Sequence, residues 1–360
     1  MLPRFITHHL SLIVSVFVPN GLFAAFAFAF LFAACNGDGD KPVAADTPAK
    51  PTRTPVSTPT FVADSAYLFV KKQVDFGPRV PGSAAHKKCA AWLASEFRRF
   101  GLTVVEQKFQ AKTYFGPLEA VNIIGQYRPE LPDRVLLCAH WDSRHIADKD
   151  AKDKNKPILG ADDGGSGVGV LLEIARALQT NPVPMGVDFV LFDAEDLGDD
   201  RDETASDSPL KQATQESKAE TWCLGSQHWA ANPHKPGYTA RFGILLDMVG
   251  AKGAQFPREG YSMVNALPVQ DKIWGIASEL GFGNLFQNRE GGGITDDHLF
   301  VMRGRQIPTV DIIGMPNPSP HVFGAHHHTH NDNMSVIDRE VLRAVGQVVL
   351  ETVYRTYNQG

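Results

Sequence analysis

The stretch VLLCAHWD (residues 135–142) is a short apolar run that ends in an imidazole and a carboxylate. Two later apolar runs end in the same way, because residues 187–192 lead into Asp193-Ala194-Glu195-Asp196 and residues 242–246 lead into Asp247. Short runs of β-forming residues that are apolar on both faces are typical of central strands covered by helices on both sides. The carboxyl ends of such strands meet at one edge of a sheet, so we expect these polar groups to share a crevice.

Helical periods alternate with strands along the rest of the chain. Ser83 is placed to cap a helix that Gly101 ends, and further helices are expected at about 166–179, 268–280 and 338–356. Three more strands are expected at residues 102–109, 121–127 and 307–313. This alternation predicts an α/β fold, a three-layer α/β/α domain around a central, mostly parallel mixed sheet.

The composition excludes several classes of protein. The 360 residues include 35 Lys plus Arg and 40 Asp plus Glu, and this net charge of −5 lacks the basic excess of a nucleic-acid binder. With 43% hydrophobic and 21% charged residues, the bulk of the chain is expected to fold around a core. Four cysteines, at positions 35, 89, 138 and 223, are too few for a disulfide scaffold, so the fold depends on packing.

The N-terminus has the features of a secretory signal. Arg4 precedes an almost uncharged apolar run over residues 10–34, which ends in small residues directly before Cys35. This ending resembles a bacterial lipobox, which implies that residues 1–34 are a signal peptide and that Cys35 carries lipid. An uncleaved anchor is the alternative, because the run is about long enough to span a bilayer.

The segment from residue 35 to residue 60 is expected to be a tether. It is rich in Pro, Thr, Ala, Asp and Lys and has no apolar period, so it cannot bury enough surface to fold. The catalytic domain is predicted to occupy residues 61–360. The expected protein is an extracytoplasmic lipoprotein of a bacterium, periplasmic or on the cell surface, whose only membrane contact is its N-terminus.

Two loops add further ligand-type residues to the predicted crevice. GADDGGSG (residues 160–167) precedes a helix, and HHHTHND (residues 326–332) precedes the last helix. Several carboxylates cannot share a dry crevice as anions unless a cation neutralises them or some become protonated. Together with imidazoles they fit zinc better than calcium or magnesium, which prefer oxygen ligands.

Each of these loops also has a simpler interpretation. Asp162 and Asp163 would fit a turn with a helix cap, and the histidines of residues 326–330 would fit a solvated loop. A phosphate-binding P-loop is excluded, because residues 160–167 lack the Gly-Lys-Ser/Thr ending. All five segments occur in the order expected for groups that gather at the ends of the predicted strands, and this favours the metal site.

The motifs resemble a known family. His140-x-Asp142, residues 160–163, Glu195-Asp196, Asp247 and His328-Thr329 are similar to the zinc aminopeptidase-like fold family, which includes dinuclear aminopeptidases and the animal-type glutaminyl cyclases. The similarity spans about residues 65–357. Within it, four stretches look like the cyclase branch, in particular its bacterial members: residues 76–83, 224–226, 245–251 and 296–298.

This resemblance implies that the protein converts N-terminal glutaminyl residues of peptides and proteins to pyroglutamyl residues and releases ammonia. It also implies one zinc ion per chain. The residue roles that it implies are metal ligation by Asp163, Asp196 and His328, catalytic acid and base function by Glu195, and assistance by the carboxylates of Asp247 and Asp296.

The chain departs from the family pattern in places. The family often has Glu-Glu where this chain has Glu195-Asp196, and the animal enzymes have Trp where this chain has His327. The sequence therefore leaves undecided which aromatic residues form the wall of the substrate pocket. Trp222 and Phe323 are its candidates, with a core role for Trp222 equally open, and further substrate contacts are assigned to His140 and His298. Cys138 has no partner like that of the animal cysteine pair, so it is expected to be a buried strand residue.

Two other functions remain open. In a two-zinc aminopeptidase, His140 and Asp247 would hold the second zinc, Asp163 would bridge the two ions, and Glu195 would activate water. The other alternative is a catalytically inactive binding ectodomain on the same scaffold. The metal content separates the three, because one zinc favours the cyclase, two favour the peptidase and none favours the binding protein.

Overall fold

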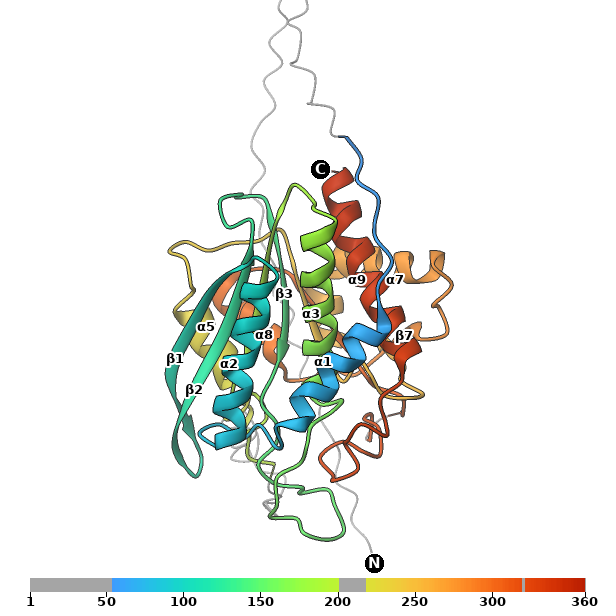
Figure 1. Cartoon of the computed structure of the whole chain (residues 1–360). Helices are drawn as coiled ribbons and strands as arrows, with labels where there is room; N and C mark the ends of the chain where they lie inside the picture. The colour runs from blue at the N-terminus through green and yellow to red at the C-terminus, as the bar shows by residue number, and fades with distance from the viewer. Residues whose placement is uncertain (1–53, 201–217, 319–320, 360) are drawn as a thin grey trace, which may run out of the picture. The chain divides into compact units, whose positions relative to one another are not determined.

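The computed structural model describes residues 54–200, 218–318 and 321–359, which lie within one compact unit from Arg53 onward. A six-stranded sheet in the order β1-β2-β4-β3-β5-β8 forms its centre (Figure 1). The strands are β1 Thr103–Thr113, β2 Gly116–Tyr127, β3 Arg134–His140, β4 Gly186–Phe192, β5 Gly243–Asp247 and β8 Thr309–Ile313. The neighbours β4, β3, β5 and β8 run parallel, whereas β2 pairs antiparallel with both β1 and β4. The predicted mixed, mostly parallel sheet is confirmed.

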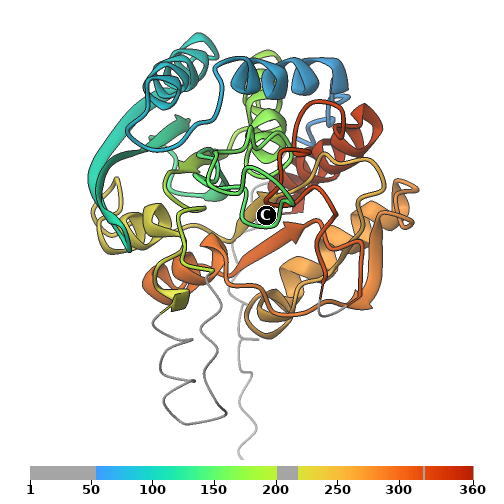
Figure 2. The same cartoon turned by 90° about the horizontal axis from the view of Figure 1, so that it is seen from below.

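Helices cover both faces of this sheet (Figures 1 and 2). The helices are α1 Ala63–Asp75, α2 Ala84–Arg99, α3 Gly165–Thr180, α5 Leu224–Ala231, α6 Gly260–Asn265, α7 Leu267–Glu279, α8 Asp297–Arg305 and α9 Arg339–Gln359. A small parallel pair, β6 Phe256–Arg258 and β7 Phe286–Glu290, lies outside the main sheet. In Figure 2, α1, α2, α3 and α9 lie on one side of the sheet and α5 and α8 on the other, which gives the three predicted layers.

Strand β3 shows why the central strands are apolar on both faces. Val135, Leu137 and Ala139 pack into the large core with α1, α2, α3 and α9, while Leu136 and Cys138 pack into a second core with α5 and α8. Every residue of β3 and β4 is buried. A strand with a core on each side is therefore apolar at most positions, and the buried charges of Arg134 in β3 and Asp188 in β4 pair with each other.

Most of the predicted elements are confirmed. The hydroxyl of Ser83 accepts a hydrogen bond from the backbone N–H of His86 at 3.1 Å, and Gly101 has a φ of +78° just after α2, as the capping residues indicate. Helices α3, α7 and α9 match the three further predicted helices within a few residues. Helices α1, α5 and α8 fall outside the predicted ones.

The N-terminal part of the described chain packs against α9. The backbone N–H of Val56 donates to Asn358 Oδ1 at 2.9 Å, and Gln347 Nε2 donates to the carbonyl of Pro59 at 3.1 Å. Contacts with the domain therefore begin before residue 61. The predicted signal peptide and Cys35 lie outside the described residues. Within the described ranges, none of the helices combines the length and apolar character needed to cross a membrane.

Candidate metal centre and active site

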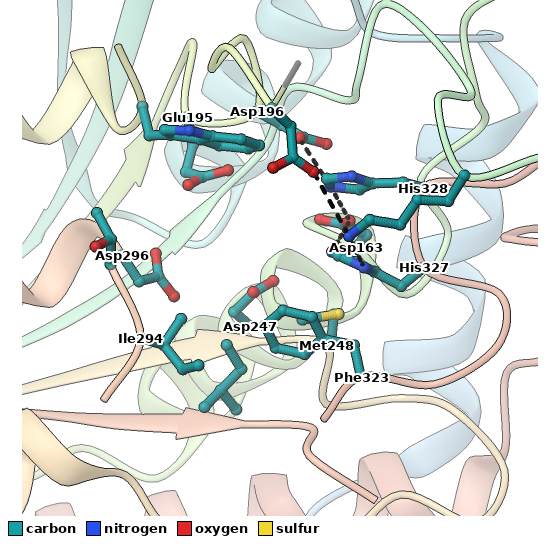
Figure 3. Close-up of a pocket in the computed structure, with 15 residues that line it drawn as sticks. Asp163, Glu195, Asp196, Asp247, Met248, Ile294, Asp296, Phe323, His327 and His328 are labelled. Atoms are coloured by element: carbon teal, nitrogen blue, oxygen red, sulfur yellow. Dashed lines mark hydrogen bonds and ion pairs between the residues drawn. The ribbon is translucent and has the colours of Figure 1, made fainter. Parts of the chain in front are cut away.

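The carboxyl ends of β4, β5 and β8 meet the loops before α3 and α9 around one pocket of about 180 Å³ (Figure 3). Its polar lining includes Asp163, Glu195, Asp196, Asp247, Asp296, His327 and His328. Its apolar lining includes Trp222, Met248, Ile294, Ile313 and Phe323. The pocket therefore combines residues at the ends of strands with two loops, and it brings together Asp163 and His328, which are 165 residues apart in sequence.

The three predicted metal ligands face one another. His328 Nε2 lies 3.3 Å from Asp196 Oδ1 and 3.7 Å from Asp163 Oδ2 (Figure 3). Asp196 Oδ2 is buried and has no hydrogen-bond partner among the described residues. Because an unpaired buried carboxylate oxygen is costly, this arrangement fits a bound cation. Two carboxylates and one imidazole are a donor set that suits zinc.

Neighbouring charged groups hold these ligands in place. Asp148 Oδ1 lies 3.4 Å from His328 Nδ1, and Arg144 Nη1 donates to Asp196 Oδ1 at 3.2 Å. The histidine ligands of metal sites usually present their second ring nitrogen to a carboxylate or carbonyl, as His328 does here. The three predicted ligands are therefore surrounded by contacts that are typical of a metal centre.

Asp142 fixes the turn that presents Glu195 and Asp196. Its two carboxylate oxygens accept the backbone N–H groups of Glu195 at 3.1 Å and Asp196 at 3.2 Å. Ala194 has a φ of +56° in this turn, a left-handed conformation that such hydrogen bonds stabilise. The shorter Asp196 side chain still reaches His328, so this departure from the family pattern is compatible with a ligand role.

The glycines before and at the start of α3 allow the backbone to lie close to the ends of the neighbouring strands. Gly164 has a φ of +79°, and a Cβ atom there would lie 2.7 Å from His140 Cε1. A Cβ atom on Gly167 would lie 2.3 Å from the carbonyl oxygen of Leu246. Glycine at these positions lets α3 and the Asp163 loop contact the ends of β3 and β5. Asp332 also holds this loop, because it accepts the backbone N–H of Asp163 at 3.1 Å.

A second cluster adjoins the first through Asp163. His140 Nε2 lies 3.1 Å from Asp163 Oδ1 and 3.2 Å from Asp247 Oδ1, and the three ligand atoms lie within 4.8 Å of one another. This is where a second ion would bind in a two-zinc enzyme. His327 is also near the centre, since its Nε2 lies 3.9 Å from Asp163 Oδ2 and its Nδ1 lies 3.0 Å from Lys149 Nζ.

The buried carboxylates shift the acid–base properties of the crevice. Burial raises the pKa of Glu195 well above its usual range, and the charge of Asp296 adds to this while His140 opposes it. Burial likewise raises the pKa of Asp247 to about 7, against the hydrogen bond from His140. For Asp163 burial acts in the same direction, but the hydrogen bond and charge of His140 outweigh it and lower its pKa. This crowding of carboxylates is what a divalent cation would relieve.

The predicted substrate contacts separate into two groups. Trp222 and Phe323 line the pocket, whereas His140 and His298 are buried and do not line it. The ring of Trp222 is parallel to that of His328, with centroids 6.0 Å apart, so Trp222 is a wall of the site rather than a core residue. His298 Nε2 lies 3.1 Å from Glu259 Oε2, away from the pocket surface.

Several residues of the site carried no signal in the sequence. Arg144, Asp148 and Lys149 follow β3 in an irregular loop, and Cys223 contacts Glu195 from the start of α5. Cys138 is buried in β3, as expected, and Cys89, Cys138 and Cys223 are all free thiols. The histidines of residues 326–330 are not simply a solvated loop, because His326 pairs with Asp162 and His330 with Asp150.

Comparison with known proteins assigns the family. Residues 122–353 match the model of peptidase family M28. The chain belongs to this family. A Zn-dependent exopeptidase from Parabacteroides distasonis is 50% identical to this M28 protein, with a TM-score of 0.76, over 83% of this chain and 99% of that structure. A glutaminyl cyclase from Bacteroides thetaiotaomicron, solved with N-acetylhistamine, is 47% identical with a TM-score of 0.77 over the same shares.

A more distant relative is larger than this chain. Aminopeptidase YwaD of Bacillus subtilis is 28% identical over 242 residues, which are 65% of this chain and 44% of YwaD. The chain thus spans less than half the length of this curated relative. Relatives of this chain are therefore named for two different reactions, and the site itself must separate them.

Proposed function

We propose that this M28 enzyme is a zinc-dependent glutaminyl-peptide cyclotransferase, which converts N-terminal glutaminyl residues to pyroglutamyl residues and releases ammonia. The observation that carries this proposal is a second set of buried carboxylates, Glu195, Asp247 and Asp296, in the pocket beside the three ligands. A cyclase must take a proton from an amine and return it to a departing nitrogen, which this set suits. The similarity to a bacterial glutaminyl cyclase supports the same reaction.

We assign the metal to Asp163, Asp196 and His328, with one zinc ion per chain. Bound there, zinc supplies Lewis acidity toward the γ-carboxamide oxygen of the substrate. Asp148 and Arg144 orient two of the ligands through the contacts described above. The chain itself thereby fixes the position at which negative charge develops on the substrate.

The carboxylates would manage the protons of the reaction. The α-amine nitrogen forms a bond to the γ-carbon, the bond from that carbon to the amide nitrogen breaks, and ammonia leaves. Glu195 accepts the proton that the amine loses and delivers it to the departing nitrogen. Asp247 and Asp296 hold the N–H groups of that nitrogen.

The pocket would select the reactive conformation of the substrate. Nucleophile and electrophile belong to one residue, so most of the gain comes from holding a cyclising conformer. A pocket of about 180 Å³ between Trp222, Ile294 and Phe323 is small enough to restrict a single side chain. Its opening would leave the rest of the peptide outside, consistent with peptide and protein substrates.

A direct assay tests the proposal. The full-length zinc-loaded protein is incubated with Gln-peptides, with ammonia measured, and with Leu-anilides, with the released amine measured. We expect ammonia and a pyroglutamyl product from the first and no amine from the second. Release of amine from Leu-anilides without ammonia from Gln-peptides would reject the cyclase.

The two-zinc aminopeptidase is the second candidate, and a specific contact favours it. His140, Asp163 and Asp247 surround one point closely enough to bind an ion, and YwaD is an aminopeptidase. Elemental analysis of the purified enzyme separates the two candidates. Close to one zinc per chain supports the cyclase, whereas two tightly held zinc ions support the peptidase.

We also propose that the enzyme is a lipoprotein outside the cytoplasm, with a signal peptide at residues 1–34, lipid on Cys35 and a tether that ends before Val56, where contacts with the catalytic domain begin. The basic start, the apolar run and the small residues before Cys35 support this. Stable anchoring is expected because each buried CH₂ of the acyl chains adds about 0.8 kcal/mol. Cys35→Ser should abolish lipid labelling and processing together. An unmodified mature N-terminus downstream of Cys35, found by intact mass, would contradict the anchor.

A further inference from the structure

Cys223 contacts Glu195 through both its side chain and its backbone. Its Sγ lies 3.2 Å from Glu195 Oε1, and its backbone N–H donates to the carbonyl of Glu195 at 3.0 Å. The next residue, Leu224, donates its N–H to the carbonyl of Ala194 at 3.1 Å. Cys223 is fully buried and has a φ of +56° at the start of α5, so its side chain is aimed at Glu195 by a constrained backbone.

The thiol is placed to act as a hydrogen-bond donor. Burial raises the pKa of Cys223 well above its usual range, and the nearby charge of Glu195 raises it further. The sulfur therefore keeps its proton, and a thiol has only one to donate. The Glu195 oxygen at 3.2 Å is the acceptor within reach.

An unfilled acceptor lies across from this pair. An oxygen of Asp296 lies within 4.8 Å of both the Cys223 sulfur and a Glu195 oxygen. Asp296 Oδ2 is buried and has no hydrogen-bond partner among the residues that the structure describes. Asp296 also has an atom within 4.8 Å of His298 and Asp311, but it lines the pocket, so the N–H₂ of a bound carboxamide is a suitable donor to it.

We propose that Cys223 is a positioning residue: its thiol donates to Oε1 of Glu195 and so turns Oε2 toward the substrate nitrogen between Glu195 and Asp296. Without this donor the carboxylate can rotate, and either oxygen can turn away from the reacting atoms. The choice of substrate here rests on the proposed cyclase function. The role of Cys223 does not, because Glu195 is the base in the aminopeptidase alternative as well.

Substitutions of full-length enzyme test this role. We expect Cys223→Ala to lower kcat about tenfold, the effect of one hydrogen bond to a charged group, with KM and zinc content within about twofold of wild type. Cys223→Ser should recover part of the loss, because its hydroxyl is also a donor. Cys138→Ala is the matched control, since Cys138 is an equally buried free thiol whose contact is the carbonyl of Ile244.

The comparison is made with whichever reaction the wild-type enzyme catalyses, so rejection of the cyclase would not by itself reject the role of Cys223. An equal loss of kcat in Cys138→Ala, or a loss in Cys223→Ala that appears in KM or zinc content instead of kcat, would overturn the proposal. Failure of Cys223→Ser to exceed Cys223→Ala would also overturn it.

Infrared spectroscopy gives a readout that needs no turnover. The S–H stretching band of Cys223, obtained as wild type minus Cys223→Ala, should lie at lower frequency than that of Cys138. It should move to higher frequency in Glu195→Gln, because a neutral amide oxygen accepts a weaker hydrogen bond than a carboxylate. A band that does not respond to Glu195→Gln would show that the thiol donates elsewhere and would overturn the proposal.

Discussion

The exchange of Glu195 for Gln separates proton transfer from metal binding. Gln has the same shape, and its Oε1 can still accept the thiol of Cys223, while the backbone contacts with Asp142 do not involve the side chain. The three proposed ligands are untouched. We therefore expect Glu195→Gln to fold normally and to retain its zinc.

The expected loss of rate follows from the chemistry of the replaced group. An amide nitrogen cannot accept the proton of the attacking amine or return it to the departing nitrogen. Positioned general acid–base groups contribute roughly a hundredfold to ten-thousandfold to a rate. Glu195→Gln should therefore lower kcat by that factor, which corresponds to about 3 to 5 kcal/mol of transition-state stabilisation.

The measurement combines three assays on the same preparation: ammonia release from a Gln-peptide, zinc content by elemental analysis and thermal unfolding. Glu130→Gln is the matched control, because Glu130 is exposed in the loop before β3. Cyclisation at the wild-type rate by Glu195→Gln would refute the assignment of the base. Loss of zinc along with the activity would instead make Glu195 part of the metal site.

Four further outcomes are expected. Asp196→Ala should lose zinc as well as activity in the same assays, because one of three ligands is gone. Asp247→Asn should lower kcat but keep one zinc per chain. Ser83→Ala should lower the free energy of unfolding by about 1 kcal/mol in urea titrations, because it removes the cap of α2. Burial opposes ionisation of Glu259, but hydrogen bonds from His298 and the start of α6 lower its pKa to about 2. This group stabilises the fold above its unfolded pKa of about 4.3, so the stability difference from Glu259→Gln, up to about 3 kcal/mol, should be full at pH 7 and shrink as the pH falls from 5 toward 2.

The central sheet could be predicted because its strands are buried on both faces. Residues 135–139 are a continuous apolar run, residues 187–192 are apolar except for Asp188, and β3 and β4 are buried at every position. Helices α5 and α8 have eight and nine residues, which is too short for a helical period to stand out from a loop. Their place on the second face follows from tertiary packing of residues such as Trp229 and Val301 against the sheet.

The candidate site could be predicted only where its residues lie at or just after the carboxyl ends of parallel strands, which meet at one edge of the sheet. His140 and Asp247 end strands of the same sheet and Glu195 follows another by three residues, so their meeting at one edge could be predicted. The contact of Arg144 with Asp196 joins residues 52 apart, and Cys223 reaches Glu195 from 28 residues away. Such contacts depend on the paths of irregular loops, which have no period or spacing to read in the sequence.

The choice between one and two zinc ions depends on the state of Asp247. A ligand of a second ion must be ionised and has both its charge and a lone pair committed to the metal. A carboxyl group that holds and shares the protons of a departing amide must instead be able to exist in both protonation states near neutral pH. Burial and the charge of Asp296 raise the pKa of Asp247 to about 7, against the hydrogen bond from His140, so this carboxyl group suits the second role as long as no ion binds it. Asp247 Oδ1 already lies 3.2 Å from His140 Nε2, so a hydrogen-bonded imidazole meets this carboxylate where the second ion would otherwise bind. Metal content therefore decides between the two roles: one zinc ion per chain would leave His140, Asp163 and Asp247 as a hydrogen-bonded group that can share a proton, whereas two would make them ligands.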